Sequence, residues 1–289
     1  MKVCLSCAAR FASADWVCPS CGASPAVDDG LPVFAPALAA GGGEDADYPL
    51  SALFDAETRH FWFSARTRLV AWALRKYFPQ CRSLLDVGCG TGGMLAGLRP
   101  SINGVRAEAA DALTSALMYA RRRLPGIPLA QMDIGHLPYD REFDVVGAFD
   151  VIEHLDDDVG ALREMHRTCT VGGGVIVTVP QHRFLWSHVD EHSRHRRRYA
   201  RRELVGKLQH AGFVVERATS FVTLLIPALV LARWIRRDAT EKDPASELQI
   251  GNGANTVGRY ASQVESLAIR AGLSLPLGGS LLAVARRTS

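Results

Sequence analysis

The fold is decided by one stretch, Ser83-Leu84-Leu85-Asp86-Val87-Gly88-Cys89-Gly90-Thr91-Gly92-Gly93. Its first five residues form a short apolar run, which is typical of a strand buried in a parallel sheet. The glycines that follow allow tight turns and let a ligand touch the backbone. Residues 94–98 then favour a helix. A strand, a glycine turn and a helix open a nucleotide-binding α/β unit, so the stretch predicts a parallel sheet with a ligand at the turn.

Further apolar runs on both sides of polar segments predict the rest of this sheet. We expect later strands at residues 102–105, 127–132, 143–149 and 175–179, a sixth strand from residue 213 and a final one at 278–286. Helices are expected at 109–123, at 156–169 and up to His210, and the glycines at 172–174 are expected to end the second of them.

Three motifs in this region resemble those of class I S-adenosylmethionine-dependent methyltransferases. They are the glycine turn at 86–92, an acid followed by Leu-Pro-Tyr and Phe-Asp-Val-Val between 133 and 146, and Val-Ile-Glu-His-Leu at 151–155. The resemblance begins near residue 60. It implies a Rossmann-like seven-stranded α/β domain over residues 83–289, with an antiparallel last strand and a helical insertion at 222–275. It also implies S-adenosylmethionine as the methyl donor.

The same resemblance implies which residues hold the donor. They are Asp86, Gly88, Cys89, Gly90 and Gly92 at the glycine turn, Asp133 at the adenine amino group with Ile134 beside it, and Asp150 at the carboxyl edge of the sheet. The family normally has an acid directly after the second strand, where it holds the ribose. Here Arg106 follows residues 102–105, so either Glu108 reaches the ribose or the ribose is held less tightly. Alternatively, Glu108 is a helix N-terminal charge.

The loop at 181–202 leaves the fifth strand at its carboxyl edge and should lie over the donor. We expect His154 and His195 to be candidate bases, Asp190 to orient one of them, and Arg198 to hold an acidic acceptor. The arginines from 194 to 202 also fit RNA phosphate contacts or the solvated start of a helix. A metal is a weaker interpretation of the His182, His188, His192 and His195 series, because its spacing matches no standard site.

The first 21 residues contain two C-x-x-C pairs, formed by Cys4, Cys7, Cys18 and Cys21. Two such pairs can complete a tetrahedral Cys4 zinc site. Two disulfides are the alternative, but they require export, and residues 1–25 contain no apolar signal segment. We therefore predict a structural zinc ribbon over residues 1–34 and a cytoplasmic protein.

The remaining segments complete the predicted organisation. Residues 35–48 contain three consecutive glycines and read as a flexible linker, and 49–82 read as an N-terminal helical cap. The aromatic stripe in this cap either covers the core or forms a lid that aims Arg66 at an anionic group. The apolar run at 221–235 is too short to span a bilayer. It fits a core-packing helix or, as the alternative, a flank that contacts a membrane surface or a lipid substrate.

The predicted function is methyl transfer from S-adenosylmethionine to a small-molecule, glycan or lipid-linked acceptor, on oxygen. Amine methylation of bases is disfavoured because residues 150–152 read Asp-Val-Ile rather than Asn/Asp-Pro-Pro-aromatic. One alternative is an RNA methyltransferase that uses the ribbon to bind RNA. Against it stand a net charge of only +3 and few basic residues in the ribbon. The other alternative is a non-catalytic cofactor-binding or assembly protein, which Arg106 at the ribose position would favour.

Overall fold

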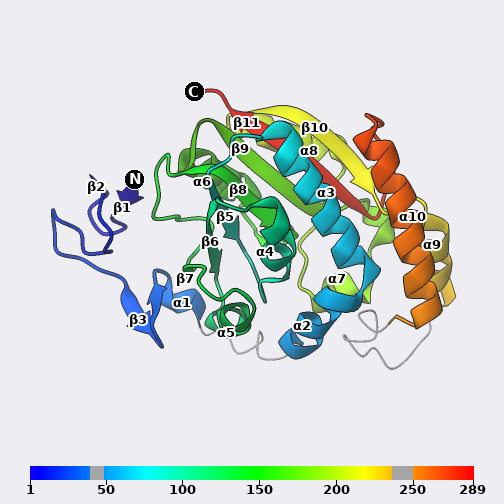
Figure 1. The fold of residues 1–289 in the computed structure, drawn as a ribbon, viewed down its shortest axis with the longest axis horizontal. Helices are drawn as coiled ribbons and strands as arrows, with labels where there is room; N and C mark the ends of the chain where they lie inside the picture. Colours follow the sequence, from blue (N-terminus) through cyan, green and yellow to red (C-terminus); the bar gives the residue numbers. More distant parts are fainter. Residues whose placement is uncertain (40–48, 236–249) are drawn as a thin grey trace.

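The computed structural model describes residues 1–39, 49–235 and 250–289, and nine of its strands form one sheet in the order β10-β11-β9-β8-β5-β6-β7-β4-β3 (Figure 1). These strands are β3 (Ala26–Asp28), β4 (Leu31–Val33), β5 (Ser83–Val87), β6 (Arg106–Asp111), β7 (Leu129–Gln131), β8 (Phe143–Phe149), β9 (Cys169–Pro180), β10 (Phe213–Phe221) and β11 (Ser280–Arg287). Strands β4 to β9 pair in parallel, whereas β11 is antiparallel to both neighbours. The Rossmann-like α/β sheet with an antiparallel last strand is therefore confirmed.

The second strand lies later in the chain than we predicted. Residues 102–105 form a turn, closed by a hydrogen bond from the Val105 N–H to the Ile102 carbonyl, with Gly104 at φ 78°. Strand β6 follows at 106–111, and the next helix begins at Thr114 instead of residue 109. The prediction was wrong because three alanines give β6 little apolar contrast, although Ala107, Ala109 and Ala110 are all buried.

The glycines at 172–174 do not end a helix as predicted but lie inside β9. Gly174 pairs with Arg286 of β11 and with Val145 of β8. A Cβ atom on Gly174 would lie 2.1 Å from the Ala285 carbonyl oxygen, so only glycine allows β9 and β11 to approach this closely.

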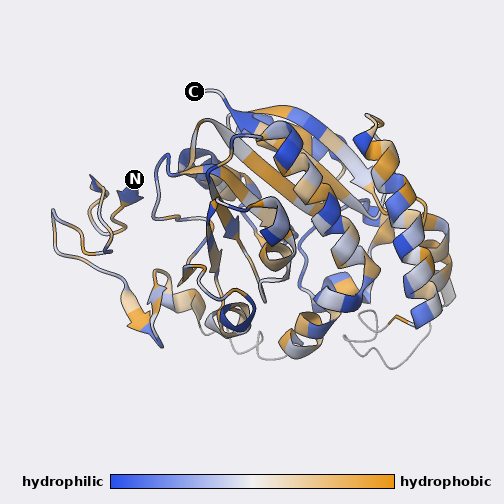
Figure 2. Ribbon diagram, in the orientation of Figure 1, coloured by the Kyte–Doolittle hydropathy of each residue, from blue (hydrophilic) through white to orange (hydrophobic). Residues whose placement is uncertain are grey.

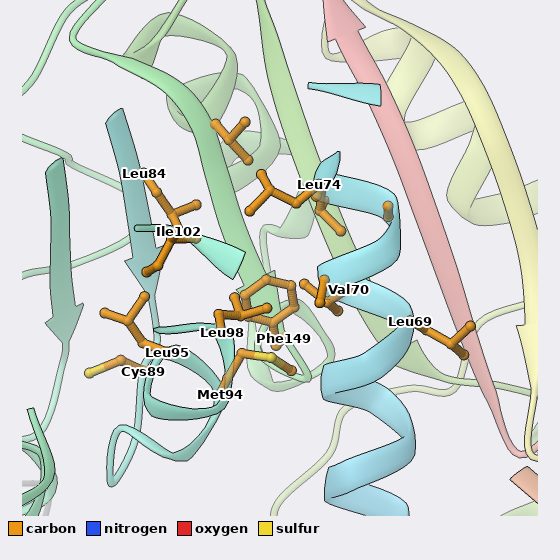
Figure 3. Close-up of a cluster of buried hydrophobic side chains, with 14 of the residues drawn as sticks. Leu69, Val70, Leu74, Leu84, Cys89, Met94, Leu95, Leu98, Ile102 and Phe149 are labelled. Carbon is orange, nitrogen blue, oxygen red and sulfur yellow. The ribbon is translucent and has the colours of Figure 1, made fainter. Parts of the chain in front are cut away.

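Helices cover both faces of the sheet. One layer contains α3 (Phe61–Tyr77), α4 (Gly93–Leu98) and α5 (Thr114–Arg123), and the other contains α6 (Asp158–Thr168) and α8 (Arg201–His210). Figure 2 shows that the central strands are predominantly apolar, as strands covered on both faces must be. Figure 3 shows Val70 and Leu74 of α3 facing Leu98 of α4 and Phe149 of β8, while Leu69 extends from the other side of the helix. This packing fixes α3 above the end of β8.

The helical insertion predicted between the sixth and seventh strands is present. It contains α9 (Ile226–Ile235) and α10 (Asn252–Arg270), and α10 packs against α3. Residues 236–249, between these two helices, lie outside the described residues. Within the described part of the chain, no helix combines the length and the apolar character needed to cross a bilayer. α2 (Leu50–Arg59) precedes α3 and is separated from it by His60.

The N-terminal segment is joined to the sheet domain. We predicted that residues 29–34 close the cysteine-rich module, but β3 and β4 extend the central sheet, with β4 parallel to β7. Part of the predicted linker is the short helix α1 (Pro36–Ala39), and residues 40–48 lie outside the described residues. Before them, β1 (Lys2–Val3) and β2 (Arg10–Phe11) form a small hairpin.

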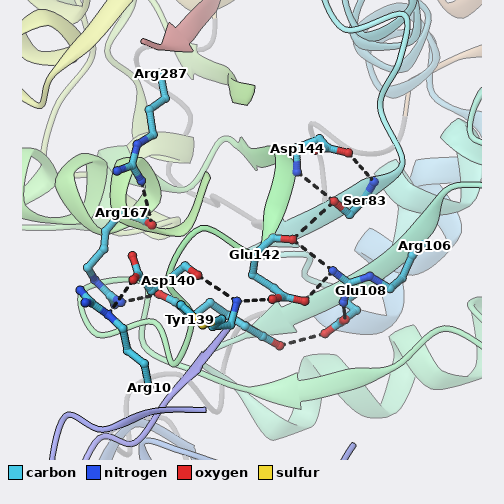
Figure 4. A network of polar contacts seen from close by, with 11 residues as sticks. Arg10, Ser83, Arg106, Glu108, Tyr139, Asp140, Glu142, Asp144, Arg167 and Arg287 are labelled. Atoms are coloured by element: carbon cyan, nitrogen blue, oxygen red, sulfur yellow. Dashed lines mark hydrogen bonds and ion pairs between the residues drawn. The ribbon is translucent and has the colours of Figure 1, made fainter. Parts of the chain in front are cut away.

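A polar network ties this hairpin to the domain (Figure 4). Arg10 forms an ion pair with Asp140 at 2.7 Å, and the N–H of Val3 donates to the Pro138 carbonyl at 2.9 Å. Trp16 packs edge-on against Phe34 and Tyr139. The cysteine-rich segment is thus fixed at the β7 end of the molecule, opposite α9 and α10 (Figure 1).

Candidate functional site

A cavity of about 1710 Å³ opens at the carboxyl ends of the parallel strands. Its lining comes from the glycine turn after β5, the junction of α2 and α3, the loop after β9, and the insertion helices. We call the part lined by Gly88, Gly90, Asp111 and Asp133 the glycine-turn end, and the part lined by His154, His195 and Arg198 the histidine end. Open parallel sheets bind ligands at this edge.

The glycine turn leaves room for a ligand against its backbone. Gly88 and Gly90 have φ values of 74° and 54°, in the left-handed region that favours glycine. A Cβ atom on Gly88 would collide with Val151, whereas one on Gly90 would meet no heavy atom within 4 Å. Gly90 therefore faces open space in the cavity. Gly92 lies outside the lining and packs against Leu124.

Asp86 lies beneath the glycine-turn end with no protein partner for its carboxylate. Its side chain is buried, and neither carboxylate oxygen accepts a hydrogen bond within the described structure. Burial raises the pKa of this carboxyl to about 7, although the positive charge of Arg66 opposes the shift. A buried acceptor beside an open cavity fits a ligand that brings a cationic donor, such as the amino group of S-adenosylmethionine.

Asp111, which the sequence did not single out, ends β6 and lines the same cavity. Its Oδ2 accepts a hydrogen bond of 2.7 Å from the Gly90 N–H, and its Oδ1 accepts one of 2.9 Å from Leu113. Asp111 thus occupies the place, directly after the second strand, at which the family carries its ribose acid. The signal in the sequence was an acid at the end of an alanine-rich run.

Glu108, which we expected at the ribose, lies elsewhere. It sits inside β6, accepts a hydrogen bond of 2.8 Å from the Tyr139 hydroxyl and pairs with Arg106 at 2.6 Å (Figure 4). It is not part of the cavity lining. Arg106 begins β6, so it does not replace the acid at the end of that strand.

The other residues predicted at the donor also line the cavity: Cys89, Asp133, Ile134, Asp150 and Arg66. Asp133 Oδ1 accepts a hydrogen bond of 2.8 Å from the Gly135 N–H, and Asp133 Oδ2 lies 2.8 Å from His136 Nδ1. Arg66 forms an ion pair with Asp150 and lies 4.5 Å above the centre of the Trp62 ring. Its anionic partner is therefore a residue of the protein.

Glu57 of α2, which the sequence analysis did not identify, closes the glycine-turn end. Its carboxylate accepts hydrogen bonds from the Thr91 hydroxyl and from Arg123 of α5. Arg123 also lies 3.8 Å above the centre of the Phe54 ring. These contacts fasten α2 over the turn.

At the histidine end, a buried Asp190 organises two side chains that reach the cavity. Its carboxylate lies 2.9 Å from His195 Nδ1 and accepts two hydrogen bonds from Arg198, at 2.7 and 2.9 Å. Burial opposes ionisation of Asp190, but the hydrogen bonds from His195 and Arg198 outweigh it and hold its pKa well below the ordinary value. Asp190 itself does not line the cavity, so it is a positioning residue.

The His154 and His195 rings lie edge to face, with centroids 4.8 Å apart. Burial and the neighbouring His195 lower the pKa of His154 to about 4, so that its imidazole is neutral near pH 7. The contact of His195 with Asp190 uses Nδ1 and leaves Nε2 available. Four predicted residues, His154, His195, Arg198 and Asp190, are thus assembled at one end of the cavity.

The four N-terminal cysteines also come together. Their sulfur atoms lie within 4.8 Å of one another, with Cys4 and Cys21 at 3.6 Å and Cys7 and Cys18 at 3.7 Å. Sulfur atoms bound tetrahedrally to zinc at about 2.3 Å would be about 3.8 Å apart, whereas a disulfide requires about 2 Å. The arrangement fits a Cys4 ion site.

Comparisons with known proteins agree with this architecture. A family model described as a methyltransferase domain matches residues 54–218. A probable S-adenosylmethionine-dependent methyltransferase of Mycobacterium tuberculosis is 30% identical over 132 residues, covering 44% of this chain and 45% of that protein. The malonyl-[acyl-carrier protein] O-methyltransferase of Halorhodospira halophila is 29% identical over 143 residues, covering 46% and 48%. The chain thus spans about half the length of these curated relatives.

Among solved structures, phosphoethanolamine N-methyltransferase 2 of Haemonchus contortus, in complex with S-adenosyl-L-methionine, superposes with a TM-score of 0.51. It is 17% identical, and the match covers 77% of this chain and 52% of that one, so it supports the fold alone. The family model covers more than half of the 289 residues. The sheet order, the glycine turn and this match lead to one conclusion: the chain belongs to the methyltransferase-domain family.

Proposed function

We propose that this protein transfers a methyl group from S-adenosylmethionine to an oxygen of a small-molecule, glycan or lipid-linked acceptor. The observation that carries the proposal is the continuous cavity, which joins an unpartnered Asp86 and the open glycine turn to the oriented histidine and arginine side chains. The sulfonium methyl carbon is already electrophilic. The protein therefore has to align donor and acceptor and remove one proton.

At the glycine-turn end, we assign Asp86 to the amino group of the donor, Asp111 to its ribose and Asp133 to its adenine. At the histidine end, we assign loss of the acceptor's proton to His195, which Asp190 orients through Nδ1. An ionised carboxylate beside an imidazole stabilises the imidazolium that forms when the ring accepts a proton. Arg198, held by the same carboxylate, is placed to bind an acidic group of the acceptor.

The cavity has an apolar wall as well as these polar groups. Val222, Leu225 and Leu229 at the start of the insertion and Val257 of α10 contribute to its lining. Such a wall suits an acceptor with an apolar part, as in a lipid-linked or acyl compound. Support for oxygen as the acceptor atom comes from the Halorhodospira relative, whose name describes an O-methyltransferase.

One observation weighs against each of the two alternatives. The basic residues of the ribbon are engaged internally: Lys2 donates to the Ala14 and Asp15 carbonyls, and Arg10 pairs with Asp140. This leaves little free charge on the ribbon for RNA phosphates. The non-catalytic alternative depended on Arg106 at the ribose position, where Asp111 lies instead. We propose structural zinc for the Cys4 cluster.

The donor assignment is tested by calorimetric titration with S-adenosylhomocysteine. A hydrogen bond to a charged group is worth about 1.5–3 kcal/mol, so Asp111→Asn should weaken binding by about 10- to 100-fold. Glu108→Gln, which alters the other acid of β6, should bind like the wild type. Equal affinity in all three proteins would contradict the assignment.

The transfer itself is tested with methyl-labelled S-adenosylmethionine and a panel of apolar hydroxyl, carboxyl and amine acceptors. We expect labelled ethers or esters from the wild type, and loss of product in His195→Ala with donor affinity intact. His188→Ala is the matched control, because His188 lines the same cavity without contacting Asp190. Labelled amines alone, or full turnover in His195→Ala, would contradict the proposal.

A further inference from the structure

Glu153 is a buried acid at the histidine end of the cavity, and nothing in the proposed transfer uses it. Its side chain is fully buried, yet it belongs to the cavity lining. Neither of its carboxylate oxygens accepts a hydrogen bond from another described residue. Burial, reinforced by the Asp150 carboxylate, raises its pKa well above the ordinary value. A buried carboxyl group without partners is costly, because it has lost its hydration without compensation.

The local charges leave Glu153 as the acid without a counterion. Arg66 pairs with Asp150, and Arg198 pairs with Asp190 through two hydrogen bonds. Both nearby guanidinium groups are therefore already matched by a carboxylate of their own. A cation beside Glu153 would favour release of the carboxyl proton and would balance the carboxylate charge that forms.

The imidazole rings of His154 and His195 lie next to the Glu153 carboxylate. Ligand atoms of Glu153, His154 and His195 all lie within 4.8 Å of one another. His195 is fixed through Nδ1 by the buried Asp190, which leaves Nε2 as a free electron pair donor. Histidines that bind metals are characteristically oriented in this way, by a carboxylate on the second ring nitrogen. His154 is neutral near pH 7, as a ligand must be.

We infer that Glu153, His154 and His195 form a binding site for a divalent transition-metal ion inside the cavity. Two histidines and one carboxylate on one side of an ion leave its other positions open to the cavity. Ligands at about 2.1 Å from an ion lie about 3–3.4 Å apart, so binding draws the three side chains slightly together. The histidine spacing in the 181–202 loop could not predict this site. Only His195 comes from that loop, and the other two ligands come from the segment after β8.

The chemical consequence rests on the proposed function. An acceptor hydroxyl bound to the ion loses its proton to water at a lower pH than a free hydroxyl. The oxygen electron pair then forms the bond to the methyl carbon, while the carbon–sulfur bond breaks and its electron pair stays on sulfur. When the ion is bound, Nε2 of His195 is one of its ligands, so the proton goes to water and not to His195 as it would in the metal-free site.

Manganese(II) is a suitable probe, because it prefers nitrogen and oxygen ligands over the thiolates of the Cys4 cluster. The full-length protein is first washed with a weak chelator until it releases no more metal. Mn²⁺ is then titrated in, and the loss of the free-ion electron paramagnetic resonance signal is followed. We expect one bound Mn²⁺ per chain in the wild type, and at least tenfold weaker binding in Glu153→Gln and in His195→Gln.

His188→Ala is the matched control and should bind Mn²⁺ like the wild type. Retained affinity for S-adenosylhomocysteine shows that each variant is folded. Absence of bound Mn²⁺ in the wild type, or unchanged binding in both site variants, overturns the inference. The binding assay involves no turnover. If Mn²⁺ binds as expected but no acceptor is methylated, the proposed function fails while the metal site stands.

Discussion

At the scale of single residues, the buried Asp86 carboxyl group makes the free energy of unfolding depend on pH. Burial raises its pKa from 3.8 to about 7, so the folded chain keeps this proton over a range in which the unfolded chain has lost it. Its contribution to the free energy of unfolding therefore falls as the pH rises from about 4 to about 7. Asp86→Asn has no such proton to lose.

We therefore expect Asp86→Asn to resemble the wild type near pH 4 and to become more stable than it by a few kcal/mol near pH 8. Urea unfolding without donor, at a series of pH values, measures this difference. Comparing variant with wild type cancels the other titrating groups. Parallel pH profiles for the two proteins would contradict the assignment. The same variant should lose affinity for S-adenosylhomocysteine.

Residue patterns predicted the glycine-turn end better than the histidine end. Asp86, Gly88 and Gly90 lie in one unbroken motif, so their neighbourhood in the fold follows from local chain geometry. Asp111 was not predicted because the alanines of β6 give too weak an apolar pattern to identify the strand that it ends. The Glu153 and His195 pairing joins positions 42 residues apart through a buried Asp190, and no local pattern encodes such an approach.

At the scale of elements, the junction of α3 and α10 forms a wall of the cavity. Gly258 of α10 lies against the buried Phe61 of α3, and both residues line the cavity. A Cβ atom on Gly258 would lie 2.6 Å from the Phe61 ring. A Cβ atom on Gly253 of the same helix would meet no heavy atom within 4 Å.

The same substitution at these two glycines should have opposite effects. Gly253→Ala should raise the free energy of unfolding by up to about 1 kcal/mol, because alanine favours a helix. Gly258→Ala should lower it by about 1–3 kcal/mol, because the crowded ring cannot move freely. Denaturant unfolding of both variants tests this. Equal effects would show that α10 is not held against Phe61 as described.

The sequence predicted most elements of the sheet domain, because long apolar runs and glycine turns mark them. The sequence-based prediction was wrong where contacts between distant segments determine which residues form a strand. The run at residues 29–34 reads as a turn and one short strand, but nothing local to it shows that this strand pairs with β7 and so belongs to the central sheet. The glycines at 172–174 look like a helix stop, but they lie inside a strand, where the close approach of β11 requires a glycine at position 174.

At the scale of the whole molecule, the cysteine cluster supports the domain through the contacts of Arg10 and Trp16. We expect the purified protein to contain zinc at the Cys4 cluster. Cys7→Ser should remove this zinc and lower the Tm by several degrees, because the docked segment loses its order. Cys81→Ser, which changes a cysteine outside the cluster, should keep both zinc and Tm. Metal analysis and thermal unfolding measure the two quantities.

An equal loss in both cysteine variants, or a zinc-free wild type, would contradict the metal assignment. Retained donor binding in Cys7→Ser would show that the segment stabilises the fold without shaping the donor site. None of residues 1–34 lines the cavity, at either its glycine-turn end or its histidine end. We therefore expect donor affinity to survive.

The pairing of β4 with β7 has one more consequence, which concerns self-association. Without residues 1–34, the backbone N–H and C=O groups on the outer side of β7 would form an open edge, a template on which another chain can add a strand. With these residues present, the strand at this edge is β3, which is only three residues long, exposed and terminated by Asp28. Short, charged edges resist such addition. Residues 1–34 thus protect the sheet from edge-to-edge aggregation, and a fragment trimmed to residues 49–289 would lose that protection.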